Sequence, residues 1–174
     1  TYTEEASEAE TLVVDVKDAL TGVKAELSYT IFREGGILAR NVRFLNEGEE
    51  SVHLTQAMSL CLDLPDPDYE WLQLSGSWAR ERHVKKRALT QGITAIDSMR
   101  GNSSHEQNPF IVLKRPSADE RQGEAFGISL VYSGNFLMQA EVDAHNTLRL
   151  LAGINPSGFD WKLEPGERFQ TPEA

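Results

Sequence analysis

Two short segments combine an aromatic ring with polar and charged groups that could bind a ligand. The first is Gly76–His83, which reads GSWARERH, and the second is Ser103–Phe110, which reads SSHEQNPF. Trp78 lies between a glycine and charged groups, outside any apolar run. A sugar has apolar C–H faces and a rim of hydroxyls, so a ring beside hydrogen-bonding groups suits a carbohydrate. The plainer interpretation, which composition alone favours, is a tryptophan packed over one end of a β-sandwich.

Other candidate sites in the sequence are weaker. The chain has no phosphate-binding glycine loop and no dinucleotide pattern. His105-Glu106 begins like a zinc-protease motif, but Pro109 replaces the second histidine and is incompatible with the required helix. Four carboxylates resemble hard-cation ligands, yet their spacing fits no EF-hand and two prolines among them favour a turn: Asp63, Asp66, Asp68 and Glu70. We therefore expect no metal site and no cofactor.

The charge balance argues against polyanionic partners. The sequence has 17 Lys+Arg against 27 Asp+Glu, a net charge of −10. Nucleic-acid binders concentrate positive charge, and anionic membrane surfaces attract basic segments, so neither partner is expected. No apolar run approaches the ~20 residues that cross a bilayer. A local basic run could bind an anion, although we favour a solvated strand; its members are Arg80, Arg82, Lys85, Lys86 and Arg87.

The elements that must position these segments follow a period of two. Apolar and polar residues alternate along Val23–Ile31 and Phe136–Val142, and six of seven alternate positions are apolar along Val52–Leu64. Such alternation is typical of half-buried antiparallel strands. Turn-forming residues separate the runs, and no stretch of ten residues shows a helical apolar stripe. The sequence therefore predicts an all-β fold, a sandwich or a barrel.

Length and cysteine content add two expectations. The 174 residues fit one domain. Cys61, the single cysteine, closes no intrachain disulfide and fits a reducing compartment. The N-terminal residues lack the basic and apolar regions of a signal peptide, so we expect a cytoplasmic protein. Because the chain begins with Thr instead of Met, we suspect an excised piece of a longer protein.

Several motifs together resemble one known family. GSWARERH, SSHEQNPF, VYSGNF, INPSGFDWKLEPGE and FQTPE occur in an order that resembles the N-terminal domain of glycoside hydrolase family 36 α-galactosidases. The similarity runs from about EAETL to the last residue. In that family this domain is a β-supersandwich of the galactose-mutarotase type, which precedes a (β/α)8 catalytic barrel. The resemblance thus implies an antiparallel β-sandwich as a single domain across residues 1–174, without the barrel.

The resemblance also implies an activity for a longer parent protein. Family members hydrolyse terminal α-galactosides such as melibiose and raffinose with retention, using two aspartates of the barrel. Their Lys-Trp-Asp and Ser-Asp-Asp motifs are absent here, so the resemblance assigns this chain no catalytic residue. We expect a non-catalytic piece of the N-terminal domain that is inactive alone. In the family, loops of this domain help to wall the galactose pocket, often across an interface of a homotetramer.

The resemblance assigns site residues one by one. Trp78 matches a tryptophan that contacts substrate, while Arg80, His105 and Asn108 lie in matching motifs and would support the loops. Glu106 departs from the family's more usual glutamine and adds a negative charge near a sugar-facing loop.

Two alternatives to the α-galactosidase domain stay open. The chain could be a stand-alone carbohydrate-binding or oligomerisation module. It could also be an aldose 1-epimerase-like enzyme, in which His105 acts with Glu81 or Glu106 as acid and base. Because a sandwich without its neighbours exposes strand edges and apolar surface, we further expect the chain to self-associate.

Overall fold

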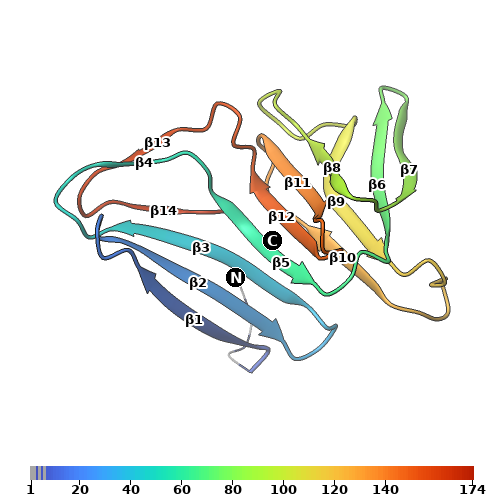
Figure 1. Cartoon of the computed structure of the whole chain (residues 1–174), viewed down its shortest axis with the longest axis horizontal. Coiled ribbons are helices and arrows are strands. Elements are labelled where there is room, and N and C mark those ends of the chain that lie inside the picture. Colours follow the sequence, from blue (N-terminus) through green and yellow to red (C-terminus); the bar gives the residue numbers. More distant parts are fainter. Residues whose placement is uncertain (1–2, 4, 6) are drawn as a thin grey trace.

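The computed structural model describes residues 3, 5 and 7–174, and this part of the chain consists of strands and loops (Figure 1). Within it, no helix is long or apolar enough to cross a membrane. The strands are β1 (Ala9–Lys17), β2 (Val23–Phe32), β3 (Leu38–Asn46), β4 (Val52–Leu54), β5 (Met58–Leu64), β6 (Glu70–Ser77), β7 (Arg80–Ala88), β8 (Gly92–Asp97), β9 (Gln107–Lys114), β10 (Ala125–Ser129), β11 (Phe136–Val142), β12 (Leu148–Ile154), β13 (Trp161–Leu163) and β14 (Arg168–Gln170).

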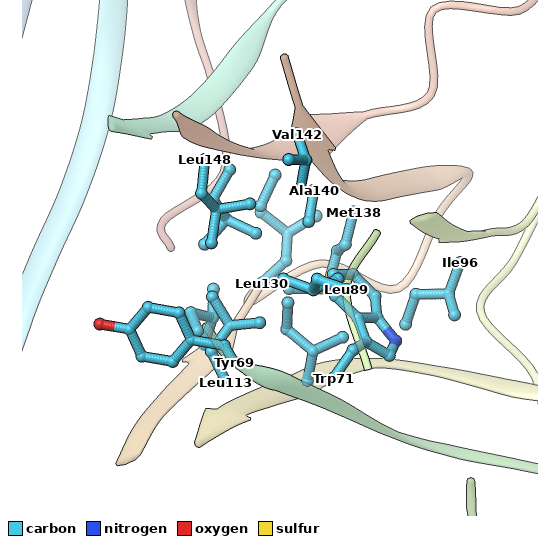
Figure 2. Packing of buried hydrophobic residues seen from close by; sticks show 14 of the residues in the cluster. Tyr69, Trp71, Leu89, Ile96, Leu113, Leu130, Met138, Ala140, Val142 and Leu148 are labelled. Carbon is cyan, nitrogen blue, oxygen red and sulfur yellow. The ribbon is translucent and has the colours of Figure 1, made fainter. Parts of the chain in front are cut away.

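Two four-stranded antiparallel sheets form a sandwich around the main core. One has the strand order β5-β12-β11-β8 and the other β10-β9-β6-β7. Every second residue of β11 from Phe136 to Val142 is buried, as the alternation of its sequence predicts. Figure 2 shows Trp71 and Leu113 from one sheet facing Met138 and neighbours from the other. The expected all-β antiparallel sandwich is confirmed.

A third sheet, of order β1-β2-β3-β14, flanks this sandwich (Figure 1). Its inner strand β3 is tied to β5 by Arg40, whose Nη1–H donates to the Cys61 carbonyl at 2.9 Å. The Arg40 guanidinium also lies over the Tyr29 ring, 5.0 Å from its centroid. Backbone bonds in both directions join Arg40 to Ala174. A short ribbon of β13 and β4 completes the fold.

The predicted strands agree with the structure except along Val52–Leu64. Val23–Ile31 lies in β2 and Phe136–Val142 is β11. The third run is not one strand, because β4 pairs with β13 whereas β5 pairs with β12 in another sheet. The chain changes sheets at residues 55–57, where Ala57 is fully buried. Because the alternation continues through this break, it suggests one long strand. That expectation is wrong, since β4 and β5 belong to different sheets.

Candidate functional site

A β-hairpin carries the first of the two singled-out segments away from the core. Trp71, near the start of β6, is fully buried, whereas every residue of β7 is exposed. The hairpin projects beyond the sandwich at the upper right of Figure 1. We call its outer part, Ser75–His83, the β6–β7 arm. Trp78 occupies the turn at its tip and is 84% exposed. The basic run forms the solvated strand that the sequence predicted.

The backbone of the arm is tightly constrained. The register between β6 and β7 shifts between Ser75 and Ser77. At Gly76 in this bulge, an added Cβ would lie 2.2 Å from the Arg80 carbonyl oxygen, so only glycine fits. Ala79 and Arg82 have positive φ angles of 63° and 57°, which costs an L-residue about 1–2 kcal/mol each. The sequence around Trp78 thus holds one particular turn.

Glu81 closes this turn. The Ala79 N–H donates to the Glu81 carboxylate at 2.8 Å. Hydrogen bonds from the backbone N–H groups of Glu81 and Ala79 lower the pKa of Glu81, and the charges of His105 and Arg82 lower it further. A carboxylate with a lowered pKa stays ionised at neutral pH.

The second segment packs against the base of the arm. The Gly76 N–H donates to the Glu106 carbonyl at 3.0 Å. Within this loop, the Glu106 N–H donates to Ser104 Oγ at 3.1 Å. An open depression forms where the arm meets the loop, lined by Glu81, Arg82, Ser103, Ser104, His105 and Asn108. One backbone hydrogen bond thus joins two motifs that lie far apart in the sequence.

The structure divides the predicted site residues into two places. His105 and Asn108 line the depression. Trp78 and Arg80 lie on the arm beside it, both exposed, and do not line it. Sequence reasoning did not assign Arg82 or the two serines to this place, although their motifs were identified. The extra negative charge of Glu106 is compensated by an ion pair with Arg100.

Two buried acceptors lie at the start of β9. Gln107 Oε1 and Asn108 Oδ1 are buried, and neither accepts a hydrogen bond from the described part of the chain. Leaving a buried acceptor unpaired costs about 1–3 kcal/mol. Asn108 also lines the depression, but its amide oxygen is buried, so a hydroxyl group in the depression would reach this oxygen only after the side chain moves.

Three of the four carboxylates that resembled cation ligands have separate ion-pair partners. Asp63 binds Arg149 Nε at 2.7 Å, and Asp66 binds Arg115. Glu70 lies between Lys86 and Lys114, at 3.0 and 2.9 Å. Over residues 3, 5 and 7–174, no group of three or more metal-ligating side chains gathers. Asp63, Asp66 and Glu70 therefore pair with nearby arginine and lysine side chains.

Comparison with known proteins supports the resemblance noted in the sequence. The family described as Glycosyl hydrolase family 36 N-terminal domain matches residues 1–164. The α-galactosidase AgaA of Geobacillus stearothermophilus is 50% identical over 174 residues, which are 100% of this chain and 24% of AgaA. The α-galactosidase Mel36A of Lactobacillus acidophilus is 41% identical over 173 residues, 99% of this chain and 24% of Mel36A. The chain thus spans about a quarter of these curated relatives.

Solved structures give the same result. A variant of AgaA in complex with stachyose superimposes with a TM-score of 0.97 at 50% identity, over 99% of this chain and 24% of that one. A variant in complex with raffinose has a TM-score of 0.98 over the same shares. The galactosidase domain of the α-galactosidase–sucrose kinase AgaSK is 36% identical, with a TM-score of 0.92 over 95% of this chain and 23% of that one. The chain therefore belongs to the glycosyl hydrolase family 36 N-terminal domain family.

Proposed function

We propose that the chain is a non-catalytic domain of a longer, retaining α-galactosidase that hydrolyses terminal α-galactosides such as melibiose and raffinose. The proposal is supported by relatives named α-galactosidases, in which the matching region makes up 24% of the protein. The AgaA complexes with stachyose and raffinose suggest the class of substrate.

The role proposed for this domain is to supply part of the wall of the galactose pocket through Trp78. The observation that carries this role is an indole 84% exposed at the tip of a tightly constrained arm. An exposed indole on a fixed turn loses little freedom when it covers the apolar face of a sugar. Hydrogen-bonding groups for the hydroxyl rim lie nearby, at Glu81, His105 and Asn108.

The acid–base chemistry of the described site argues against catalysis by the chain itself. A general acid or base works best with a pKa near the working pH, and a retaining glycosidase needs an acid whose pKa is raised. The pKa of Glu81 is lowered, and Glu106 forms an ion pair with Arg100. This weakens the epimerase alternative, in which one of these carboxylates acts with His105.

The proposed activity can be tested with the full-length protein and the chain in parallel. The full-length protein is expected to release galactose from raffinose and from an aryl α-galactoside. Proton NMR at early times is expected to show the α-anomer as the first product, as retention requires. The chain alone is expected to be inactive. Appreciable turnover by the repurified chain, or a first product with the β-configuration, would contradict the proposal.

A stand-alone sugar-binding module remains the second candidate because Trp78 is exposed on the arm and the depression beside the arm is lined by polar groups such as His105 and Asn108. This candidate predicts saturable binding of galactose by the chain alone, measured as shifts of the Asn108 amide signals in NMR. Binding that is lost in Trp78→Ala and kept in Leu20→Ala, an exposed control elsewhere, would favour the module over the enzyme domain.

A further inference from the structure

Two asparagines hold the loop on which the β6–β7 arm rests, and neither has a part in the function proposed above. Asn135 belongs to the VYSGNF motif and directly precedes β11, whereas Asn155 belongs to the INPSGFDWKLEPGE motif and directly follows β12. The loop is Ser98–Glu106, which joins β8 to β9. Because none of its residues belongs to a strand, its shape depends on hydrogen bonds to other parts of the fold.

Asn155 ties the start of this loop to the core from a buried position. Its side chain is 5% exposed. Its Nδ2 donates to the Ser98 carbonyl at 3.2 Å, to the Phe136 carbonyl at 3.3 Å and to Asp97 Oδ2 at 3.3 Å. Its Oδ1 accepts the Ser157 N–H at 3.0 Å. An amide is needed here, because an aspartate of the same shape would supply no donor.

Asn135 holds the middle of the same loop. Its Oδ1 accepts the Gly101 N–H at 2.6 Å, and its carbonyl accepts the Asn155 N–H at 3.0 Å. The nearby Ser133 carbonyl accepts the Ser103 N–H at 2.8 Å. The turn before β11 thus binds the loop at two of its backbone N–H groups.

The loop in turn contacts the base of the arm. Arg100 forms an ion pair with Glu106 across the loop, and the Glu106 N–H donates to Ser104 Oγ at 3.1 Å. The Glu106 carbonyl accepts the Gly76 N–H at 3.0 Å, within the bulge of β6 that precedes Trp78. Hydrogen bonds and short chain segments therefore connect the two asparagines with the tip of the arm.

The reach of the Asn135 side chain distinguishes it from side chains that only shape their own turns. Asp119 Oδ1 accepts the N–H groups of residues two and three positions ahead, and Asp143 Oδ1 those of residues two and four positions ahead. Asn135 Oδ1 instead accepts an N–H that lies 34 positions away in the sequence. Its hydrogen bond therefore fixes one loop relative to another, which a purely local turn does not require.

We propose that Asn135 and Asn155 position Trp78 by fixing the loop Ser98–Glu106, which supports the base of the arm. Neither asparagine lines the depression beside the arm, so both are positioning residues and not sugar ligands. A displacement of about 1 Å in a binding group can lower a rate about a hundredfold. The effect on turnover rests on the proposed function, since the position of Trp78 matters only where this ring contacts the galactoside.

Hydrogen exchange of the full-length protein, followed by mass spectrometry, tests the positioning independently of activity. Asn135→Ala removes the acceptor of the Gly101 N–H, so peptides from the loop and from the arm should exchange about three- to tenfold faster. Peptides from β11 and β12 should be unchanged. Asn135→Asp keeps an acceptor oxygen and should restore slow exchange. Asn102→Ala is the matched control in the same loop, because Asn102 is exposed and only its backbone carbonyl is hydrogen-bonded within the described residues.

A paired substitution tests Asn155. Asn155→Asp keeps the shape of the side chain but places an oxygen against the Ser98 and Phe136 carbonyls and the Asp97 carboxylate, so the loop and the arm should exchange faster. Adding Asp97→Asn restores a donor–acceptor pair between the two side chains and is expected to recover part of the protection. A combined variant that exchanges as fast as Asn155→Asp alone would overturn the role of Asn155.

A double-mutant cycle in the full-length protein tests whether the loop acts through Trp78. Asn135→Ala is expected to lower kcat/KM for raffinose about three- to tenfold in the unmodified enzyme, but less than about twofold when Trp78→Ala is also present. Equal losses in the two backgrounds, or unchanged exchange of the arm in Asn135→Ala, would overturn the proposal. An unchanged kcat/KM in Trp78→Ala alone would instead contradict the proposed function, so the two failures are distinguishable.

Discussion

Two tryptophans on one hairpin have opposite environments. Trp71 is fully buried between the sheets, and its Nε1–H donates to Gln73 Oε1 at 2.9 Å. Trp78, at the other end of the same strand pair, is 84% exposed. Burying an indole stabilises the fold, whereas exposing one contributes nothing to stability. The hairpin thus has a base that is fixed in the core and a tip whose aromatic ring is exposed, and we propose that this ring contacts a sugar.

The largest expected difference between the two tryptophans is in their contribution to the stability of the fold. Trp71→Ala leaves a large cavity between the sheets and should lower the free energy of unfolding by about 3–5 kcal/mol. Trp78→Ala should change it by less than about 0.5 kcal/mol. Urea denaturation of both variants measures the difference. Similar losses in the two variants would show that the tip also packs against the fold.

The next effect concerns the bulge that separates base from tip. Gly76→Ala places a Cβ 2.2 Å from the Arg80 carbonyl oxygen, so the backbone must move. We expect a loss of about 1–3 kcal/mol and altered amide shifts from Ser75 to His83. Gly127→Ala is the matched control, because its Cβ would lie 3.6 Å from Phe110, an ordinary contact. If Gly76→Ala behaved like this control, the arm would not depend on the bulge.

A smaller effect is expected at the tip. Glu81→Ala removes the acceptor of the Ala79 N–H, so exchange of the Ala79 amide should accelerate about three- to tenfold. Glu81→Gln keeps an acceptor oxygen and should restore most of the protection. Hydrogen exchange followed by NMR distinguishes the two variants. Equal exchange in Glu81→Ala and the unmodified chain would mean that this bond does not hold the turn.

The smallest expected effect is a dependence of the stability of the fold on pH. Hydrogen bonds from Arg149, Arg115 and Lys114 lower the pKa values of Asp63, Asp66 and Glu70, respectively. Each pair therefore stabilises the fold above the ordinary carboxyl pKa of about 4, and this contribution is lost as the pH falls through the lowered values. Thermal unfolding between pH 7 and acid should show the decrease. A Tm that rises on acidification below pH 4 would contradict the assignment.

Strands can be predicted where apolar and polar residues alternate regularly along the sequence. The alternation does not show where the chain leaves one sheet and pairs with a strand of another. β2 and β11 were recognised because their buried faces are regular. The alternation along Val52–Leu64 predicts one strand, because alternation does not reveal that β4 pairs with β13 and β5 with β12. β1 shows no such pattern because both of its faces are exposed.

The sequence predicts the residues of the candidate site but not that its two motifs lie side by side. The two motifs were identified separately, and the resemblance assigned Trp78, Arg80, His105 and Asn108. The hydrogen bond from the Gly76 N–H to the Glu106 carbonyl, which joins the motifs, involves backbone atoms that any residues carry. No residue type therefore signals it. The roles of the four residues remain predictions.

We propose that Trp78 contributes to a galactoside pocket and not to the stability of the fold. The most direct measurement is kcat/KM for raffinose in the full-length protein carrying Trp78→Ala, Trp78→Phe or the control Leu20→Ala. We expect Trp78→Ala to lower kcat/KM about tenfold to a hundredfold, which corresponds to ~1.4–2.7 kcal/mol, with an unchanged Tm. Trp78→Phe should recover part of the loss, and Leu20→Ala should match the unmodified enzyme. An unchanged kcat/KM in Trp78→Ala would contradict the claim.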